Sequence, residues 1–232
     1  MITRRNFLET VMLAGTWVLG AGALTACGQS RGAGASDSET PTTEAADETA
    51  SASGSVEASA SDAAAANAIV IYFSRAGENY GVGVVEQGNT AVLAEMVAAR
   101  TGSELFEISP IIAYPEGYDE CCDVALEEKN AGARPAYVGD VDLASYKTVY
   151  LGYPIWWGDL PMCVYTFLEA HDWAGKDILP FCTHAGSGVS GTDRNIANTC
   201  AGATVGSPLA TAGTTAQNDR ETAESDVAAW LG

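Results

Sequence analysis

The chain has 232 residues, and its 30 acidic side chains outnumber 11 basic ones to give a formal net charge of −19 at pH 7. So acidic a protein is a poor candidate for binding nucleic acid, because phosphate backbones are bound by basic surfaces. It is equally unsuited to electrostatic attachment to anionic lipid. The acidic surface either suits a basic redox partner or simply keeps the protein soluble.

The first residues have the features of an export signal. Arg4 and Arg5 precede an uncharged stretch over residues 11–23, and this stretch is shorter than the roughly 20 apolar residues of a membrane-spanning helix. Paired arginines in this position are typical of twin-arginine export, and Leu-Thr-Ala-Cys at 24–27 resembles a bacterial lipoprotein box. We expect a signal peptide over 1–26 and lipid on Cys27, which would anchor the exported protein to the cell membrane, facing outside the cytoplasm. A single membrane-anchor helix is the alternative.

Residues 27–66 consist mostly of Ala, Ser, Thr, Gly, Asp and Glu, with no aromatic residue and only one β-branched aliphatic side chain, Val56. A segment of this composition buries too little apolar surface to offset the entropy of ordering it. We therefore expect residues 27–66 to be a disordered acidic tether. The remaining residues, 67–232, have the length of one globular domain.

Within that domain, apolar runs alternate with helical patterns. Strands are predicted over residues 68–74, 105–108, 148–153 and 178–182, with a weak fifth strand over 203–209; helices are predicted over 90–100, 119–128 from an Asp cap, 160–170, 192–200 and 219–231. Continuous apolar runs are typical of strands covered on both faces. The order predicts an α/β, three-layer sandwich: a five-stranded parallel sheet of order 2-1-3-4-5 with helices on both faces. Half of a Rossmann fold remains an alternative on periodicity alone.

A phosphate site is expected after the first strand, because backbone N–H groups at a helix N-terminus attract anions. The candidate residues are Ser74, Arg75, Ala76 and Gly77 at the end of the strand, with Asn89 and Thr90 at the start of the helix. No GxGxxG or Walker motif is present, which favours a monophosphate over a dinucleotide or a nucleoside triphosphate. The alternative is ordinary capping of the helix by Asn89 or Thr90. Arg75 either neutralises the phosphate or points to solvent, and residues 78–87 either arch over the site or form a surface insertion.

Two further loops follow neighbouring strands of the predicted sheet and so meet at its carboxyl edge. They contain Pro154, Ile155, Trp156, Trp157 and Gly158 in one loop, and Thr183, His184, Ala185, Gly186, Ser187 and Gly188 in the other. The first offers flat aromatic surface and the second exposed N–H groups, a combination that suits a planar heterocycle such as a flavin. The alternatives are a core position for the tryptophans and a surface position for His184.

Together with the blocks YFSRAGENY at 72–80 and GNT at 88–90, these loops resemble the bacterial flavodoxin-like family over residues 68–213. The resemblance implies a flavodoxin-like sandwich that binds FMN noncovalently. The phosphate would lie at residues 74–77 and 89–90, and the ring between the two loops. The insertion over 78–87 leaves open which of Arg75, Ala76 and Asn79 touch the phosphate.

The cysteines show no spacing that suggests a metal site. Besides Cys27, the chain has Cys121, Cys122, Cys163, Cys182 and Cys200. Since no CxxC or Cys/His pattern occurs among them, we expect neither zinc nor an iron–sulfur cluster. Five thiols are expected, with a disulfide involving Cys163 or Cys200 as the alternative.

The sequence thus predicts an FMN-binding protein that transfers electrons outside the cytoplasm. Its partner would be a redox protein, a quinone or another small-molecule acceptor. An FMN-dependent NAD(P)H or quinone oxidoreductase is the alternative, because one fold can host both activities. A surface binding module without cofactor is a third possibility.

Overall fold

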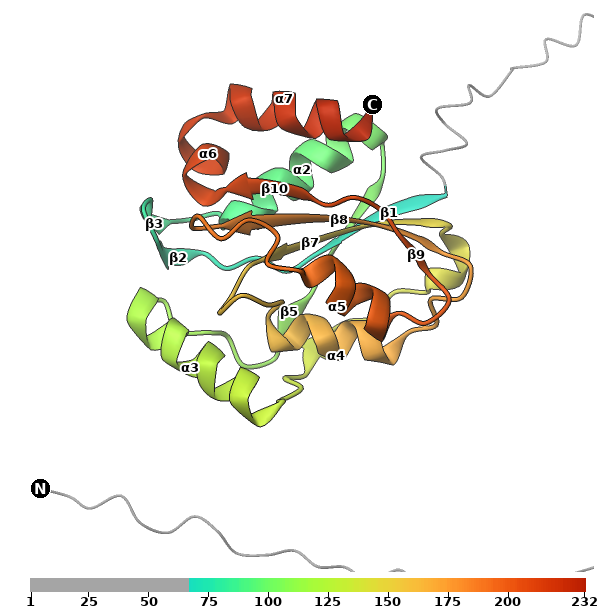
Figure 1. Cartoon of the computed structure of the whole chain (residues 1–232). Helices are drawn as coiled ribbons and strands as arrows, with labels where there is room; N and C mark the ends of the chain where they lie inside the picture. The colour runs from blue at the N-terminus through green and yellow to red at the C-terminus, as the bar shows by residue number, and fades with distance from the viewer. Residues whose placement is uncertain (1–66) are drawn as a thin grey trace, which may run out of the picture. The chain divides into compact units, whose positions relative to one another are not determined.

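The computed structural model describes residues 67–232; the predicted signal peptide, the tether and Cys27 lie outside these residues. A parallel sheet of order β10-β8-β7-β1-β4 forms the middle of the domain (Figure 1). Its strands are β1 (Ala68–Tyr72), β4 (Glu104–Glu107), β7 (Thr148–Pro154), β8 (Asp177–His184) and β10 (Leu209–Ala212). Numbered along the chain, these five strands have the order 2-1-3-4-5, so the predicted flavodoxin-like sandwich is confirmed.

The fifth strand differs from the prediction. The run over 203–209 does not form one strand: β9 (Thr204–Val205) pairs with the start of β8, and β10 pairs with its end. Gly206, Ser207 and Pro208 separate the two pieces. Proline has no backbone N–H to donate to a ladder, so pairing resumes only after it.

Helices cover both faces of the sheet (Figure 1). On one face lie α2 (Asn89–Thr101), α6 (Gly213–Asn218) and α7 (Arg220–Leu231); on the other lie α4 (Met162–Ala170) and α5 (Thr192–Thr199), with α3 (Tyr118–Ala131) beside α4. Alternate residues of β1 supply both cores: Ile69 and Ile71 belong to the same core cluster as Phe167, whereas Val70 belongs to the cluster that contains Val227. This explains why β1 is apolar at every position. No helix of residues 67–232 is both long and apolar enough to cross a bilayer.

The start of α3 and the presence of α6 also differ from the prediction. Helix α3 begins at Tyr118, and the residue at its N-cap is Gly117, so the predicted Asp cap at Asp119 is wrong. Helix α6 was not predicted. It precedes α7, whose first turn is capped by the Asp219 carboxylate, which accepts a hydrogen bond from the Thr222 amide.

The insertion over 78–87 forms most of a β-hairpin, with β2 (Gly77–Asn79) antiparallel to β3 (Gly83–Val85). A second small antiparallel pair joins β5 (Ser109–Pro110) to β6 (Tyr137–Val138), and a 3-10 turn, η1 (Leu143–Ser145), precedes β7. The β2–β3 hairpin rises from the carboxyl edge of the sheet, where the predicted site lies (Figure 1). It therefore becomes part of that site.

Candidate functional site

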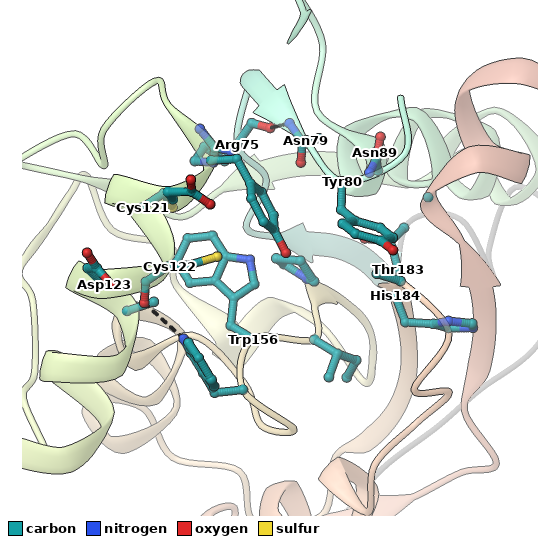
Figure 2. Close-up of a pocket in the computed structure, with 18 residues that line it drawn as sticks. Arg75, Asn79, Tyr80, Asn89, Cys121, Cys122, Asp123, Trp156, Thr183 and His184 are labelled. Carbon is teal, nitrogen blue, oxygen red and sulfur yellow. Dashed lines mark hydrogen bonds between the residues drawn. The ribbon is translucent and has the colours of Figure 1, made fainter. Parts of the chain in front are cut away.

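A cavity of about 540 Å³ opens at the carboxyl edge of the sheet. Nine of the predicted residues line it: Arg75, Asn89, Pro154, Ile155, Trp156, Trp157, Thr183, His184 and Ala185. The cavity wall does not include Ser74, Ala76, Gly77, Thr90, Gly158, Gly186, Ser187 or Gly188. Figure 2 shows Cys121, Cys122 and Asp123 on one side of the cavity, Asn89, Thr183 and His184 on the other, and Trp156 between them.

The hydroxyl groups predicted to bind phosphate are used inside the protein. The Ser74 Oγ accepts a hydrogen bond from the Ala91 amide at 3.0 Å and so caps the first turn of α2. The Thr90 hydroxyl lies 2.8 Å from that of Thr183, and both side chains are buried. This pair joins α2 to β8. The N-cap residue of α2 is Gly88, without a side-chain hydrogen bond, so the alternative that Asn89 or Thr90 caps the helix is wrong.

The N-terminus of α2 nevertheless keeps features that fit a ligand. The Asn89 Oδ1 is buried and has no hydrogen-bond partner, although Asn89 lines the cavity. A buried acceptor without a partner is costly in a folded protein and needs an explanation. Gly88 and Gly213 border this position. A Cβ on Gly88 would collide with the Ser74 side chain and the Arg75 carbonyl group. A Cβ on Gly213 would collide with the side-chain amide group of Asn89. The backbone therefore approaches this end of the cavity closely.

Arg75 is engaged with the backbone rather than pointing to solvent. Its guanidinium donates to the carbonyl oxygens of Pro115 at 2.8 Å and Glu116 at 3.0 Å, and to that of Glu78. The Glu78 carboxylate in turn accepts from the Tyr118 amide at 3.1 Å. Arg75 and Glu78 thus fasten the hairpin to the N-terminus of α3.

The tryptophan loop is a tight turn with unusual backbone geometry. The amide and carbonyl of Trp156 exchange hydrogen bonds with Asp159 at 2.9 and 3.0 Å. Between them, Trp157 has φ 52° and Gly158 has φ 73°. A bulky residue with positive φ is strained, and such strain occurs where the surroundings impose it, often at functional sites.

Helix α3 holds this strained turn in place. The Trp157 indole Nε1 donates to the Cys122 carbonyl oxygen at 2.9 Å, the bond drawn in Figure 2. Lys129 donates from Nζ to the Trp157 carbonyl oxygen at 2.6 Å. The Trp157 side chain remains 51% exposed, so its ring is available to a ligand in the cavity.

Trp156 lies deeper and is held by aromatic edges. Its ring meets Phe73 at 5.3 Å and Tyr114 at 4.8 Å, both perpendicular. The Tyr114 hydroxyl donates to the Glu128 carboxylate at 2.7 Å, and burial raises the pKa of Tyr114. The core alternative therefore applies in part to Trp156, which packs against the core yet lines the cavity, and does not apply to Trp157.

His184 has a defined protonation state. Its Nδ1 accepts a hydrogen bond from the Gly186 amide at 2.9 Å, which places the proton on Nε2. Burial lowers the pKa of His184, so the ring is neutral at pH 7. A neutral imidazole can donate from Nε2 to a ligand without adding charge.

Further residues complete the cavity. Asn79 and Tyr80 come from the 78–87 insertion, which borders the site, as one of its two predicted alternatives had it. The sequence did not predict Gly213 from α6, or Tyr118, Asp119, Cys121, Cys122, Asp123 and Ala125 from α3. We call the six α3 residues the α3 wall. Tyr80 and Tyr118 face each other with ring centroids 6.0 Å apart. The sequence features that could have pointed to these residues are the adjacent Cys121 and Cys122 in a predicted helix and Tyr80 in the insertion. Neither feature indicates a cavity unless the tertiary structure is known.

All five described cysteines are free, as predicted. Burial raises the pKa of Cys121 to about 11 and those of Cys163, Cys182 and Cys200 to about 12. These thiols are therefore protonated at neutral pH and are poor nucleophiles. Within residues 67–232, no group of three or more His, Cys, Asp or Glu side chains is placed to hold a metal ion.

The family model described as Flavodoxin matches residues 67–230. The chain belongs to the flavodoxin family. Solved structures with this fold include a flavoprotein from Bacteroides eggerthii, 27% identical with a TM-score of 0.57 over 71% of this chain and 95% of that one. A flavoprotein from Bacteroides uniformis is 28% identical, with a TM-score of 0.53 over 68% and 96% of the two chains.

A third solved structure is a flavoprotein from Lactobacillus acidophilus in complex with FMN. It is 19% identical, with a TM-score of 0.51 over 72% of this flavodoxin-family chain and 100% of that chain. At this identity the likeness shows the fold alone. No curated protein matches the chain.

Proposed function

We propose that this flavodoxin-family protein binds FMN in the cavity at the carboxyl edge and transfers electrons outside the cytoplasm, tethered by lipid on Cys27. The observation that carries the proposal is one cavity that joins a helix N-terminus with an unpartnered Asn89 Oδ1 to an aromatic turn at Trp156 and Trp157. FMN has a phosphate, hydroxyl donors and a flat ring, and these residues fit each part. The FMN complex of the Lactobacillus acidophilus flavoprotein, which shares the fold, supports the same reading.

The described residues suggest how the cofactor would be held. The N-terminus of α2 would bind the phosphate through backbone N–H groups and the helix dipole. Asn89 Oδ1 would accept a hydrogen bond from a ribityl hydroxyl, which removes the cost of leaving that atom unpaired.

The remaining contacts would act on the ring. Trp156 and Trp157 would cover it and exclude water, and His184 would donate from Nε2 to its polar edge. FMN, when bound, supplies the redox chemistry itself. The protein supplies binding, orientation and the surrounding charge.

Export and anchoring remain part of the proposal. Arg4 and Arg5, the sequence Leu-Thr-Ala-Cys at 24–27, and the composition of residues 27–66 support it. A Cys27→Ala variant, expressed in a lipoprotein-producing bacterium, should lose incorporation of labelled palmitate and leave the membrane fraction. Unchanged incorporation in this variant would refute lipidation at Cys27.

An FMN-dependent oxidoreductase is the second candidate, and one observation favours it. The hairpin and α3 add Tyr80 and the α3 wall to the cavity, which gives the site side chains that could contact a small-molecule partner. An electron carrier that exchanges electrons only with other proteins does not need the α3 wall to bind a small-molecule substrate.

Optical and redox titrations test the proposal. The purified chain should be yellow, or should turn yellow when FMN is added to the FMN-free protein, with one FMN per chain. Reductive titration should bleach the visible band reversibly. A colourless protein that takes up no FMN would contradict the proposal and favour a cofactor-free binding module. Rapid turnover of NAD(P)H would favour the oxidoreductase over the carrier.

A further inference from the structure

The hairpin and α3 form a fixed structure beside the cavity rather than a loose flap. The Arg75 guanidinium and the Glu78 carboxylate join the hairpin to residues 115–118. On its other side, the Gln217 Nε2 donates to the Gln87 carbonyl oxygen at 2.7 Å. Because it is held on both sides, the hairpin presents Tyr80 to the cavity in a defined position (Figure 2).

This part of the cavity is aromatic. The rings of Tyr80 and Tyr118 approach to 6.0 Å, and Trp157 is tied to the α3 wall by its bond to the Cys122 carbonyl. Tyr80 is 62% and Trp157 is 51% exposed. Exposed rings held at fixed positions around a cavity favour a planar aromatic ligand, which they can contact face to face or edge to face.

The charge of this part of the cavity is negative. The α3 wall contributes the exposed carboxylates of Asp119 and Asp123. Among the described residues that line the cavity, the one permanent cation is Arg75, and three backbone carbonyls already occupy its guanidinium. His184 is neutral, because burial lowers its pKa. An anionic ligand such as a dinucleotide would therefore meet two carboxylates and no free cation.

We propose that the α3 wall, together with Tyr80 and Trp157, binds a neutral or cationic planar aromatic redox molecule of the quinone or phenazinium type and disfavours anionic ones. This inference rests on the proposed binding of FMN. With a quinone, reduced FMN gives up two electrons and two protons. The quinone becomes a hydroquinone and the cofactor returns to oxidised FMN. N-methylphenazinium takes up the two electrons and one proton to become neutral N-methyl-dihydrophenazine, and the second proton passes to water.

A stopped-flow experiment on the FMN-loaded full chain tests this selectivity. The protein is reduced with dithionite under anaerobic conditions and mixed with 1,4-naphthoquinone, its 2-sulfonate or N-methylphenazinium. Two carboxylates roughly 8 Å from the ring should slow the anionic sulfonate by about threefold to tenfold relative to the neutral quinone. The electron-withdrawing sulfonate has the larger driving force, so a slower reaction cannot be attributed to redox potential.

Binding provides a readout that does not depend on turnover. The affinity of oxidised, FMN-loaded protein for the same three compounds, measured by calorimetry, should follow the order cation, neutral quinone, anion. A D119N/D123N double variant should reduce the difference between neutral and anionic quinones to less than about twofold. The matched control is E127Q, an exposed carboxylate on α3 that does not line the cavity and should leave the ratio unchanged.

A second pair of variants tests the aromatic contact. Tyr80→Ala should weaken binding of the neutral quinone by about tenfold, as expected for the loss of a stacked ring. Val84→Ala, on the same hairpin and 81% exposed, is the control and should not change binding.

The outcomes separate this inference from the proposed function. If the protein takes up no FMN, the proposed function fails. If the FMN-loaded protein binds and reduces none of the three compounds, or prefers the anion, the inference is overturned while FMN binding stands.

Discussion

The two sides of the cavity differ in the charge that they accept. On the side of α2, the cavity is bordered by Asn89 and by the N–H groups at the start of the helix. Neighbouring atoms lie so close to Gly88 and Gly213 that neither position has space for a Cβ. On the side of α3, two carboxylates and aromatic rings face the same space. One side suits an anion and the other repels it. A ligand with an anionic group at one end would therefore be oriented before any specific contact forms, because its anionic end is attracted to the α2 side and repelled by the α3 side.

The largest effect is expected from reversing the charge preference of the α2 side. Asn89→Asp places a carboxylate on the first residue of α2, beside the N–H groups that would bind the phosphate, and at roughly 5 Å and an effective dielectric constant of about 20 the repulsion costs about 3 kcal/mol. FMN affinity should fall by about two orders of magnitude. The helix itself should not suffer, because an acidic residue in the first turn is favourable.

Asp119→Asn is the matched change on the α3 side. It removes a negative charge from the opposite wall, so FMN affinity should stay within about threefold of the parent value. Fluorescence titration with FMN measures both variants. Equal effects of the two substitutions would show that the two sides do not differ as described.

The second prediction concerns the effect on stability of Gly88, which lies against Ser74 and Arg75 on the α2 side of the cavity. Gly88→Ala places a Cβ against Ser74 and the Arg75 carbonyl, where backbone must move. Overpacking of this kind should lower the free energy of unfolding by about 3 kcal/mol. Gly117→Ala, at the N-cap of α3, meets only the flexible end of Glu120, and the lower preference for alanine at an N-cap should reduce the free energy of unfolding by less than about 1 kcal/mol. Urea denaturation of the FMN-free proteins compares the two glycines.

A smaller effect is expected from the strained turn on the α3 side. Trp157→Gly relieves the positive φ but loses the indole bond to Cys122. These two changes oppose each other at about 1 kcal/mol each. The net loss of stability should therefore come from the half of the Trp157 side chain that is buried, and should be about 1–2 kcal/mol. Because Trp157 is also proposed to cover the flavin ring, the variant is first saturated with FMN, and quinone binding by the FMN-loaded variant should weaken by about tenfold. Trp157→Tyr keeps a ring and should restore most of the binding; if it binds as weakly as the glycine variant, the ring is not the contact.

The smallest effect is the pH dependence of His184. Burial lowers its pKa from the ordinary value of 6.5, so protonation is less favourable in the folded protein than in the unfolded chain. Its contribution to stability is therefore complete above pH 6.5 and falls as the pH drops below that value. The loss should be small, because the side chain is partly solvated.

His184→Gln cannot titrate and provides the control. The difference in unfolding free energy between the parent and this variant should decrease on acidification below pH 6.5, the ordinary histidine value. NMR titration of the two histidines should show His184 protonating later than a free histidine as the pH falls. A raised pKa for His184 would contradict the hydrogen bond from Gly186 to Nδ1.

The sequence predicted the sheet and one side of the cavity because both depend on local patterns. Apolar runs located the parallel strands, and the loops at Trp156 and His184 follow their ends directly. The α3 side was not predictable in this way. Tyr80 and Cys122 reach the cavity only because the hairpin and α3 are fastened together by Arg75 and Glu78, a contact between residues about 40 positions apart.

Polar residues at the α2 side show a second limit. Ser74 and Thr90 are good candidates for phosphate ligands, yet both form hydrogen bonds within the protein. A hydroxyl at a strand end or a helix start serves equally well as a cap or as a ligand. The hydrogen bonds to Ala91 and Thr183 follow from the packing of α2 against the sheet, which the local sequence does not reveal.

The interruption of the fifth strand affects how the protein behaves beside other copies of itself. At that edge of the described sheet, β9 has two residues and β10 has four, with Pro208 between them. At the opposite edge, β4 has four residues and carries a glutamate at each end. Neither edge offers a long, uncharged strand to which another chain could add. The domain is thereby protected against edge-to-edge aggregation at high local concentration.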